Sequence, residues 1–318
     1  MTSDSKRSEV WQTALRLAGT LVALGLLAYL LAQLGWREFL DALAQIPWTA
    51  FALALAMVSV SRIAGVSRWY FLLRSAEVVV PWRRAFVLTF ASLFASNFLP
   101  TTVGGDVIRI AGVAQVDSRR TAYVTSVFAD RIVGLFGMAM ALPFGVGPLI
   151  SYAHGTAAGT LLPLTGVAVG GSWFSRIRAR LRSVAQAVLE SLNLWRQNPA
   201  SVFCAFASTW VIMLGRFGSI WVLLHALDQS ISLGTIAGLW SFTYFVTLVP
   251  VSINGLGLQE LSMTFIYVAL GGVSTASILP TAILVRVMDT LVSVPGALML
   301  PQSLAWSRGR GVGTDVEL

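Results

Sequence analysis

Charged side chains are scarce in this sequence. Of its 318 residues, only 11% are Asp, Glu, Lys or Arg, whereas 56% are hydrophobic, and the mean hydropathy is +0.76. A soluble domain carries roughly 25% charged residues, so this chain has too few charges to cover a water-exposed surface. The composition therefore excludes a soluble enzyme, a disordered chain and a nucleic-acid-binding domain, and it predicts an all-α polytopic membrane protein.

Cysteine and histidine are also rare. Cys204 is the only cysteine, which excludes an intramolecular disulfide and a cysteine-based metal cluster. The two histidines, His154 and His225, lie near the ends of apolar segments and leave little for metal binding or acid–base chemistry. The chain has no H-E-x-x-H motif and no G-x-x-x-x-G-K-[ST] phosphate loop. We therefore expect no cofactor, no metal and no catalytic residues.

Long apolar segments predict the membrane topology. About 20 apolar residues span a bilayer, and six segments qualify, at about 14–34, 49–73, 121–143, 149–170, 199–224 and 278–300. Two shorter segments, 85–99 and 234–249, end at Pro100 and Pro250. We expect these two to enter the membrane and return on the same side, which gives about six full transmembrane helices plus two re-entrant broken hairpins. A plain hydropathy count gives seven or eight spans instead.

Basic residues in short loops mark the cytoplasmic side of a membrane protein. Lys and Arg at both chain ends, in 74–84 and in 173–184 predict a protein of the inner (cytoplasmic) membrane with both termini in the cytoplasm. The loop near 36–46 and the stretch 145–159 would then be external. Residues 173–198 carry apolar side chains at three- and four-residue steps, which predicts an amphipathic helix on the membrane surface. The alternative is a loop helix that touches no lipid.

One order of features occurs twice. A span containing an arginine is followed by a short segment that ends at proline, then by glycines and an acidic residue, and then by a second span containing an arginine. The chain therefore reads as a single transmembrane domain, 1–318, with one half at about 49–143 and the other at about 199–302. Under the topology above the halves run in opposite directions. Inverted repeats with paired interrupted helices indicate the binding site of many transporters, although such matches also arise by chance in chains rich in Gly and Pro.

The interrupted segments and the arginines within spans are the candidate site. A helix that starts after the glycines would direct N–H groups at an anion. An arginine at the centre of a span costs about 3 kcal/mol, so we expect these arginines to face the interior. They are Arg62, Arg131, Arg216 and Arg286, and the acidic residues at similar depth are Asp106, Asp130, Glu260 and Asp289. Either these groups form salt bridges that only lock the bundle, or the guanidiniums line a cavity for an anionic headgroup.

Arg68 and Arg74 lie nearer the cytoplasmic end of their span than Arg62. Long basic side chains near the end of a span reach the membrane interface. We therefore expect both to be interface anchors rather than site residues.

Three motifs in order resemble the lysylphosphatidylglycerol synthase transmembrane (flippase) family. They are Asn97-x-x-Pro100-x-x-x-Gly104-Gly105-Asp106-x-x-Arg109, Asp130-Arg131-x-x-Gly134-Leu135 and Pro250-x-Ser252-x-x-Gly255-x-Gly257-x-x-Glu260. The resemblance covers about residues 12–304. In the best-known members this region moves aminoacylated phosphatidylglycerol between leaflets, and other relatives are linked to polyprenyl-phosphate sugar and hopanoid pathways.

The resemblance implies a flippase that moves an anionic phospholipid or lipid-linked headgroup. The synthases of the family also carry a soluble aminoacyl-transferase domain, for which a chain ending at Leu318 leaves no room, so we expect transport without synthesis. The candidate substrate-binding residues are Arg62, Asn97, Gly104, Gly105, Asp106, Arg109, Arg131, Arg216, Asn254, Gly255, Gly257, Glu260 and Arg286.

Two alternatives to a flippase stay open. One is a membrane enzyme that acts on a lipid phosphate, with Glu260 or Asp106 as the base. The other is a non-transporting scaffold for a lipid-modifying synthase. The expected partners are an anionic membrane lipid and a separate lipid-modifying synthase, but no nucleic acid.

Overall fold

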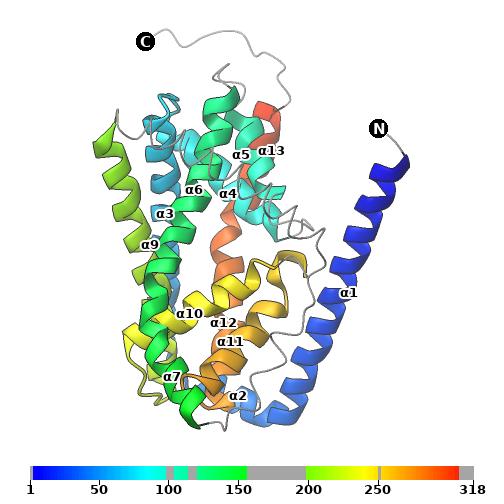
Figure 1. Cartoon of the computed structure of the whole chain (residues 1–318), viewed down its shortest axis with the longest axis vertical. Coiled ribbons are helices and arrows are strands. Elements are labelled where there is room, and N and C mark those ends of the chain that lie inside the picture. Colours follow the sequence, from blue (N-terminus) through cyan, green and yellow to red (C-terminus); the bar gives the residue numbers. More distant parts are fainter. Residues whose placement is uncertain (1–2, 98–103, 114–119, 156–197, 250–251, 308–318) are drawn as a thin grey trace.

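The computed structural model describes residues 3–97, 104–113, 120–155, 198–249 and 252–307, and every regular element within these ranges is a helix. The predicted all-α fold class is thus confirmed. Four long helices stand side by side, and two hairpins of shorter helices lie between them (Figure 1). The long helices are α3 (Trp48–Ser75), α6 (Arg120–Ala141), α9 (Pro199–Ala226) and α12 (Thr275–Ser293). The hairpins are α4 (Trp82–Ser96) with α5 (Gly104–Val113), and α10 (Leu233–Thr247) with α11 (Leu258–Ala269).

Several helices are long and apolar enough to cross a bilayer. Within the described residues there are four, Trp48–Ser75, Tyr123–Tyr152, Pro199–Ala226 and Thr275–Ser293, and there are five if the bent pair Thr20–Leu34 and Trp36–Gln45 forms one span. The second of these runs from α6 through a short 3-10 helix, η1 (Leu142–Gly145), into α7 (Val146–Gly155). The protein is therefore a multi-pass membrane protein.

Two predicted boundaries are wrong. The expected loop near 36–46 is helix α2 (Trp36–Gln45), which is bent by 84° from the first helix, α1 (Ser3–Leu34). The turn between them is made by Gly35 with φ of 90°, a value that glycine adopts readily. The expected last span, 278–300, is two helices, because α12 ends at Ser293 and α13 (Pro295–Ser307) begins at a proline that has no N–H to donate.

Other predicted elements fall on parts of the chain that the structure leaves undescribed. The amphipathic helix predicted at 173–198 and most of the span predicted at 149–170 lie outside the described residues. The number of six spans therefore stays a prediction. The first ten residues after 145, which were expected to form an external loop, continue the helical path of α6.

Corresponding helices of the two predicted halves have equal lengths. α3 and α9 each have 28 residues, and α4 and α10 each have 15. In Figure 1, α3 and α12 run from the lower end to the upper end, whereas α6 and α9 run the other way. The α4–α5 hairpin lies at the upper end, and the α10–α11 hairpin rises from the lower end. The two sets of helices thus run in opposite directions.

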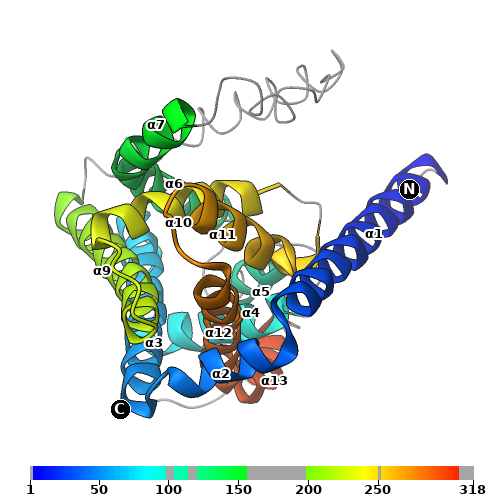
Figure 2. The same ribbon diagram turned by 90° about the horizontal axis from the view of Figure 1, so that it is seen from below.

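α3 and α9 pack closely along their length, and seen end-on they lie on the opposite side of the molecule from α1 (Figure 2). Small residues permit this approach: a Cβ at Gly215 would lie 2.8 Å from the carbonyl oxygen of Met57, and Ser61 Oγ donates to the carbonyl of Ile212 at 3.1 Å. Small residues and side-chain hydrogen bonds are the usual means of holding helices together in a membrane.

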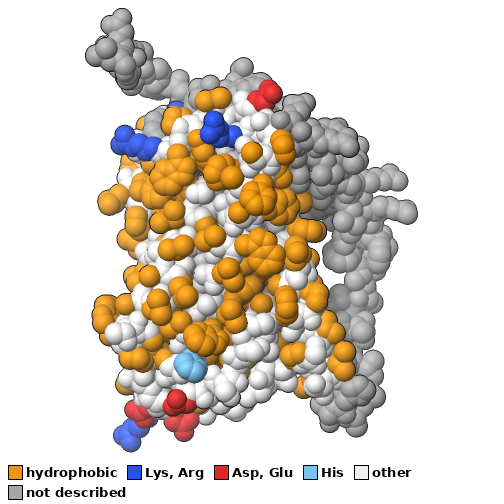
Figure 3. All heavy atoms as spheres, turned by 90° about the vertical axis from the view of Figure 1, so that its left-hand side faces the viewer, with side chains coloured by type: hydrophobic (Ala, Val, Ile, Leu, Met, Phe, Trp, Pro, Cys, Tyr) orange, Lys and Arg blue, Asp and Glu red, His pale blue; other side chains and the backbone are white. Residues whose placement is uncertain are grey.

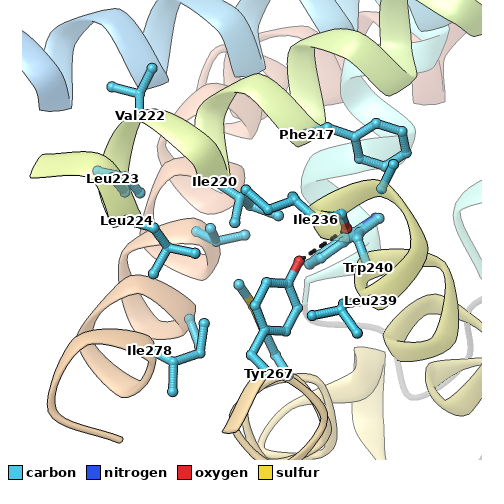
Figure 4. Close-up of a cluster of buried hydrophobic side chains, with 14 of the residues drawn as sticks. Phe217, Ile220, Val222, Leu223, Leu224, Ile236, Leu239, Trp240, Tyr267 and Ile278 are labelled. Carbon is cyan, nitrogen blue, oxygen red and sulfur yellow. Dashed lines mark hydrogen bonds between the residues drawn. The ribbon is translucent and has the colours of Figure 1, made fainter. Parts of the chain in front are cut away.

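A buried apolar cluster holds the second hairpin against α9 and α12. Figure 4 shows Tyr267 of α11 between Ile278 of α12 and side chains of α9 and α10. Tyr267 is fully buried, and its Oη donates to the carbonyl of Ile236 at 3.3 Å, which satisfies the only polar atom of this side chain.

The outer surface is apolar between two charged ends. Figure 3 shows hydrophobic side chains over most of one face, with charged groups gathered at its top and bottom. Phe203 and Leu298 are 75% and 87% exposed, respectively. Side chains of this kind are stable in contact with lipid and not with water, so the band is the surface that faces hydrocarbon.

Candidate functional site

A polar cavity of about 450 Å³ lies between the two hairpins and the long helices. Serine, threonine and asparagine side chains form part of its wall, together with Gln259 and Tyr244. Its basic lining residues are all arginines: Arg62, Arg68, Arg109, Arg131, Arg216 and Arg286. The arginines that the sequence places within spans therefore converge on one space.

Three of these arginines share two carboxylates in a first ion-pair network, built by α3, α5 and α6. Arg68 Nε donates to Asp130 Oδ1 at 2.7 Å, and Arg109 Nη1 donates to Asp130 Oδ2 at 3.2 Å. Arg109 also lies 3.9 Å from Asp106 Oδ1, and Asp106 Oδ2 accepts from Arg131 Nε at 2.7 Å. Each carboxylate thus contacts two guanidiniums.

The other three arginines pair with two further carboxylates in two separate groups. Arg62 Nη2 and Arg216 Nη2 both donate to the same oxygen, Asp289 Oδ1, at 2.6 Å each. Arg286 Nε donates to Glu260 Oε1 at 2.6 Å. The group around Asp289 joins α3, α9 and α12, and the pair of Arg286 with Glu260 joins α12 and α11. Helix α3 thus supplies Arg68 to the first network and Arg62 to the group around Asp289.

Two of these ion pairs occupy matching places in the two hairpins. Asp106 lies in the first turn of α5 and pairs with Arg131, which follows 25 residues later. Glu260 lies in the first turn of α11 and pairs with Arg286, which follows 26 residues later. A carboxylate in the first turn stabilises the positive end of the helix dipole. The chain thus supplies its own carboxylate at both helix starts.

Arg286 also holds the break in the second hairpin. Its Nη1 donates to the carbonyl of Asn254 at 3.1 Å, and its Nη2 donates to the carbonyl of Gly255 at 3.0 Å. Both residues have positive φ, 48° and 70°, in the 3-10 turn η3 (Ile253–Gly255). Carbonyls that no helix satisfies are costly in hydrocarbon, so this guanidinium makes the irregular backbone tolerable.

Two arginines lie over aromatic rings. The guanidinium carbon of Arg109 is 4.9 Å from the ring centre of Trp69, and that of Arg216 is 5.1 Å from the ring centre of Trp240. Such cation–π contacts attract a guanidinium to the face of the ring. They also fix the orientation of both guanidiniums.

Nine of the thirteen predicted binding residues line the cavity: Arg62, Asn97, Asp106, Arg109, Arg131, Arg216, Asn254, Gly255 and Arg286. The cavity brings them together from both halves of the chain. Their role in binding stays a prediction.

The other four predicted residues are absent from the described cavity lining, and three of them have packing or pairing contacts of their own. Gly104 is the first residue of α5. A Cβ at Gly105 would overlap Ser96 and lie 2.8 Å from the carbonyl oxygen of Ser92, so this glycine lets α5 pack on α4. Gly257 has φ of 74°, and a Cβ there would lie 2.7 Å from Ala23 of α1. Glu260 is buried and reaches the site through its ion pair with Arg286.

The prediction for Arg68 is wrong, because its side chain pairs with Asp130 inside the cavity and does not anchor at the membrane interface. A signal for this pair exists in the sequence. An aspartate within an apolar span requires a basic partner. Asp130 is therefore expected to pair with a basic side chain other than that of its sequence neighbour, Arg131. The structure supplies Arg68 and Arg109.

Among the residues that the structure describes, no group of three or more His, Cys, Asp or Glu side chains could hold a metal ion. The site is thus defined by guanidiniums, carboxylates and neutral polar groups.

Fold and site together define a polytopic membrane protein with an arginine-lined cavity between two broken-helix hairpins. The sequence matches the family described as "Lysylphosphatidylglycerol synthase TM region" over residues 16–296, and the chain belongs to this family. No curated protein matches the chain. The family connects the protein with lipid metabolism or transport in the membrane.

Proposed function

We propose that the protein is a flippase that moves an anionic phospholipid or a lipid-linked headgroup between the leaflets of the inner membrane. The headgroup would occupy the arginine-lined cavity, while the acyl chains stay in the surrounding hydrocarbon. The protein itself would change no covalent bond. A lipid-modifying synthase would act separately on the lipid before or after it is moved.

The observation that carries the proposal is the convergence of six arginines on one polar cavity. Arginines that served only to lock the helices would need no open space between them. A guanidinium at membrane depth is costly unless it pairs with an anion or faces water. Its planar fork of N–H donors matches the oxygens of a phosphate. A phosphate headgroup in this cavity would meet donors from both halves of the chain.

In this proposal the two hairpins open the cavity to one side of the membrane at a time. One lies at each end of the bundle, and their ends meet beside the cavity (Figure 1). Transporters with paired broken helices expose a central site first to one side of the membrane and then to the other. Movement of one hairpin at a time would carry a headgroup across without opening a continuous pore.

The orientation follows from basic residues at one end. α1 begins and α13 ends at the upper end of Figure 1. The last turn of α3, which carries Arg74, and the start of α4, which carries Arg83 and Arg84, lie at the same end. Positive charge marks the cytoplasmic side. We therefore assign this end, and with it both chain termini, to the cytoplasm.

A vesicle assay tests the proposal. Purified protein is reconstituted in vesicles that contain a fluorescent anionic phospholipid, and quenching by dithionite reports transfer between leaflets. Arg131→Gln should slow transfer about tenfold or more, which corresponds to a loss of about 1.4 kcal/mol or more of stabilisation. Asp106 keeps Arg109 as a partner in this variant, so the fold should survive. Arg83→Gln is the matched control, since Arg83 is exposed at the start of α4.

The same vesicles separate the proposal from its alternatives. Transfer at the same rate with wild-type protein, with Arg131→Gln and with empty vesicles would contradict a flippase and favour a scaffold. A change in the headgroup composition of the recovered lipids would instead identify an enzyme. A flippase alters the distribution of the lipids and leaves their chemistry unchanged.

A further inference from the structure

One group of charges in the cavity wall contains two cations and a single anion. Arg62 of α3 and Arg216 of α9 both donate to Asp289 of α12, and both bind the same carboxylate oxygen, Oδ1. Among the described residues, none of these three side chains makes a further ion pair. This group, called the Asp289 cluster below, therefore carries one net positive charge.

Hydrogen-bonding capacity is also left over in the Asp289 cluster. Nη1 of Arg216 is buried and has no hydrogen-bond partner among the described residues. The Arg216 side chain is only 10% exposed, and its guanidinium carbon lies 5.1 Å from the ring centre of Trp240. A buried donor without an acceptor is costly, so this atom points to a ligand with acceptor oxygens.

Arg286 lies one turn before Asp289 on α12 and shows a guanidinium whose nitrogens are all used. Its Nε donates to Glu260, and its Nη1 and Nη2 donate to backbone carbonyls of the η3 turn. Arg62 differs, because its bond to Asp289 is its one hydrogen bond within the described part of the chain. The Arg62 side chain is also 29% exposed, so an incoming group can reach it.

The Asp289 cluster lies deep in the membrane. Its three residues all line the cavity, and Arg62 lies in the middle of the 28 residues of α3. At this depth a charged headgroup would be far from water on both sides, so it needs an opposite charge there. Transporters with paired broken helices also bind their substrates near the middle of the membrane.

We propose that the phosphate of the transported lipid binds to the two guanidiniums of the Asp289 cluster, and that Asp289 takes the place of this phosphate between transport events. The inference rests on the proposed function and deepens it, because it assigns the phosphate to two of the six arginines. One negative charge on the phosphate neutralises the cluster. Its oxygens would accept from N–H groups that Asp289 does not use, since the guanidinium fork matches phosphate oxygens.

Asp289 affects the affinity of this site in a definite direction. Its carboxylate occupies one nitrogen of each arginine, Nη2, and its charge repels an incoming anion. Loss of the carboxylate should therefore strengthen phosphate binding, whereas loss of either arginine should weaken it. A carboxylate that only locked the helices together would not produce these opposite effects.

Melting of purified full-length protein in neutral detergent tests the inference without a transport assay. The probes are dioctanoyl phosphatidylglycerol and dioctanoylglycerol, which has the same acyl chains and no phosphate. Asp289→Asn leaves two guanidiniums without an anion, and phosphatidylglycerol should stabilise this variant by supplying one. The rise in melting temperature should be at least about twice that of the wild-type protein. A rise no larger than that of the wild-type protein, or an equal rise with dioctanoylglycerol, would overturn the inference.

Glu260→Gln is the matched control for Asp289→Asn. It also removes one buried carboxylate from an arginine, but Arg286 keeps its two carbonyl acceptors. Phosphatidylglycerol should therefore stabilise Glu260→Gln no more than the wild-type protein. Equal stabilisation of the two variants would show that the phosphate does not select the Asp289 cluster and would overturn the assignment.

Two arginine variants keep the inference testable if Asp289→Asn does not fold. Arg62→Gln and Arg216→Gln each leave Asp289 with one arginine, so both should fold, as elution volume and melting temperature verify. Each should bind phosphatidylglycerol about tenfold more weakly than the wild-type protein in a titration followed by tryptophan fluorescence. Arg83→Gln should bind as the wild-type protein does. Binding that survives both cavity substitutions overturns the assignment.

Further arms separate the source of the phosphate and the two proposals from each other. Inorganic phosphate should need at least about a tenfold higher concentration than phosphatidylglycerol for the same rise in the melting temperature of Asp289→Asn. Equal concentrations would overturn a lipid ligand. Binding at the cluster without transfer in vesicles would remove the flippase and keep the site. Transfer that is slowed by Arg131→Gln but not by Arg62→Gln or Arg216→Gln would keep the flippase and remove the site.

Discussion

Asn254 Nδ2 donates a hydrogen bond to Asn97 Oδ1 at 3.3 Å, and this bond joins the two hairpins directly. Asn97 follows the last residue of α4, and Asn254 lies in the turn before α11. Asn97 Nδ2 also donates to Ser293 Oγ at the end of α12, at 2.8 Å. One side chain thus connects both hairpins with a long helix beside the cavity. Motion of one hairpin relative to the other must break this contact.

A thiol cross-link between the hairpins should stop transport. The variant Asn97→Cys/Asn254→Cys is made in a Cys204→Ala background, which removes the only native cysteine. A short bifunctional thiol reagent then links the two positions, and lipid transfer in vesicles should fall to the rate of empty vesicles.

The two single-cysteine variants, treated with the same reagent, measure the effect of modification without a link. The linked protein should transfer lipid more slowly than either of them. A cleavable reagent should restore transport on reduction. Transfer at an undiminished rate in the linked protein would show that the hairpins do not separate during the cycle.

Asp289→Asn should destabilise the protein far more than Arg62→Gln. Asp289 is the single carboxylate between Arg62 and Arg216, so its loss leaves two guanidiniums side by side without an anion. Breaking a buried ion pair from one side costs about 3–5 kcal/mol. Arg62→Gln removes one of two partners and should cost about 1 kcal/mol. The melting temperatures of the two variants in detergent, followed by tryptophan fluorescence, measure these losses of stability. Equal melting temperatures would contradict a carboxylate shared by two arginines.

Arg286→Lys should weaken the second hairpin although the charge is kept. Lysine can pair with Glu260 but cannot at the same time donate to the carbonyls of Asn254 and Gly255. Leaving buried acceptors unsatisfied costs about 1–3 kcal/mol.

Protection from proteolysis or from hydrogen exchange in 248–258 checks the effect of Arg286→Lys locally. Arg83→Lys serves as the control, because Arg83 is exposed. The expected result is faster exchange around η3 in Arg286→Lys only. Unchanged exchange there would mean that the two carbonyls find other donors.

Gly257→Ala should be more damaging than Gly272→Ala. Both glycines have positive φ, 74° and 64°, where an alanine costs about 1–2 kcal/mol. A Cβ at Gly257 would also lie 2.7 Å from Ala23 of α1, whereas nothing lies within 4 Å of a Cβ at Gly272. Overpacking adds about 1–3 kcal/mol. The difference in unfolding free energy between the two variants therefore measures how tightly α1 packs against the second hairpin. Equal unfolding free energies would mean that α1 moves aside to accommodate the new Cβ.

Much of the fold could be predicted because the bilayer limits the choices. Long apolar segments at 49–73 and 199–224 correspond to α3 and α9, and proline ends two short segments that become α4 and α10. The prediction is wrong at 36–46, where a loop was expected, and at 278–300, where one span was expected. Hydropathy averages over many residues and therefore does not locate a turn made by one or two of them. Gly35 bends the chain between two apolar helices, and Pro295 restarts a helix within an apolar segment.

The sequence by itself determined that arginines stand within apolar spans and therefore avoid lipid, since the cost of burying charge does not depend on the fold. It could not determine which carboxylate each arginine meets. Arg62 and Asp289 are 227 residues apart, and their contact exists only because α3 and α12 pack together. The tertiary structure alone decided that Asp106 and Asp130 serve three arginines and that Asp289 serves two. This sharing follows from how helices of opposite direction enclose one cavity, and chain order does not encode it.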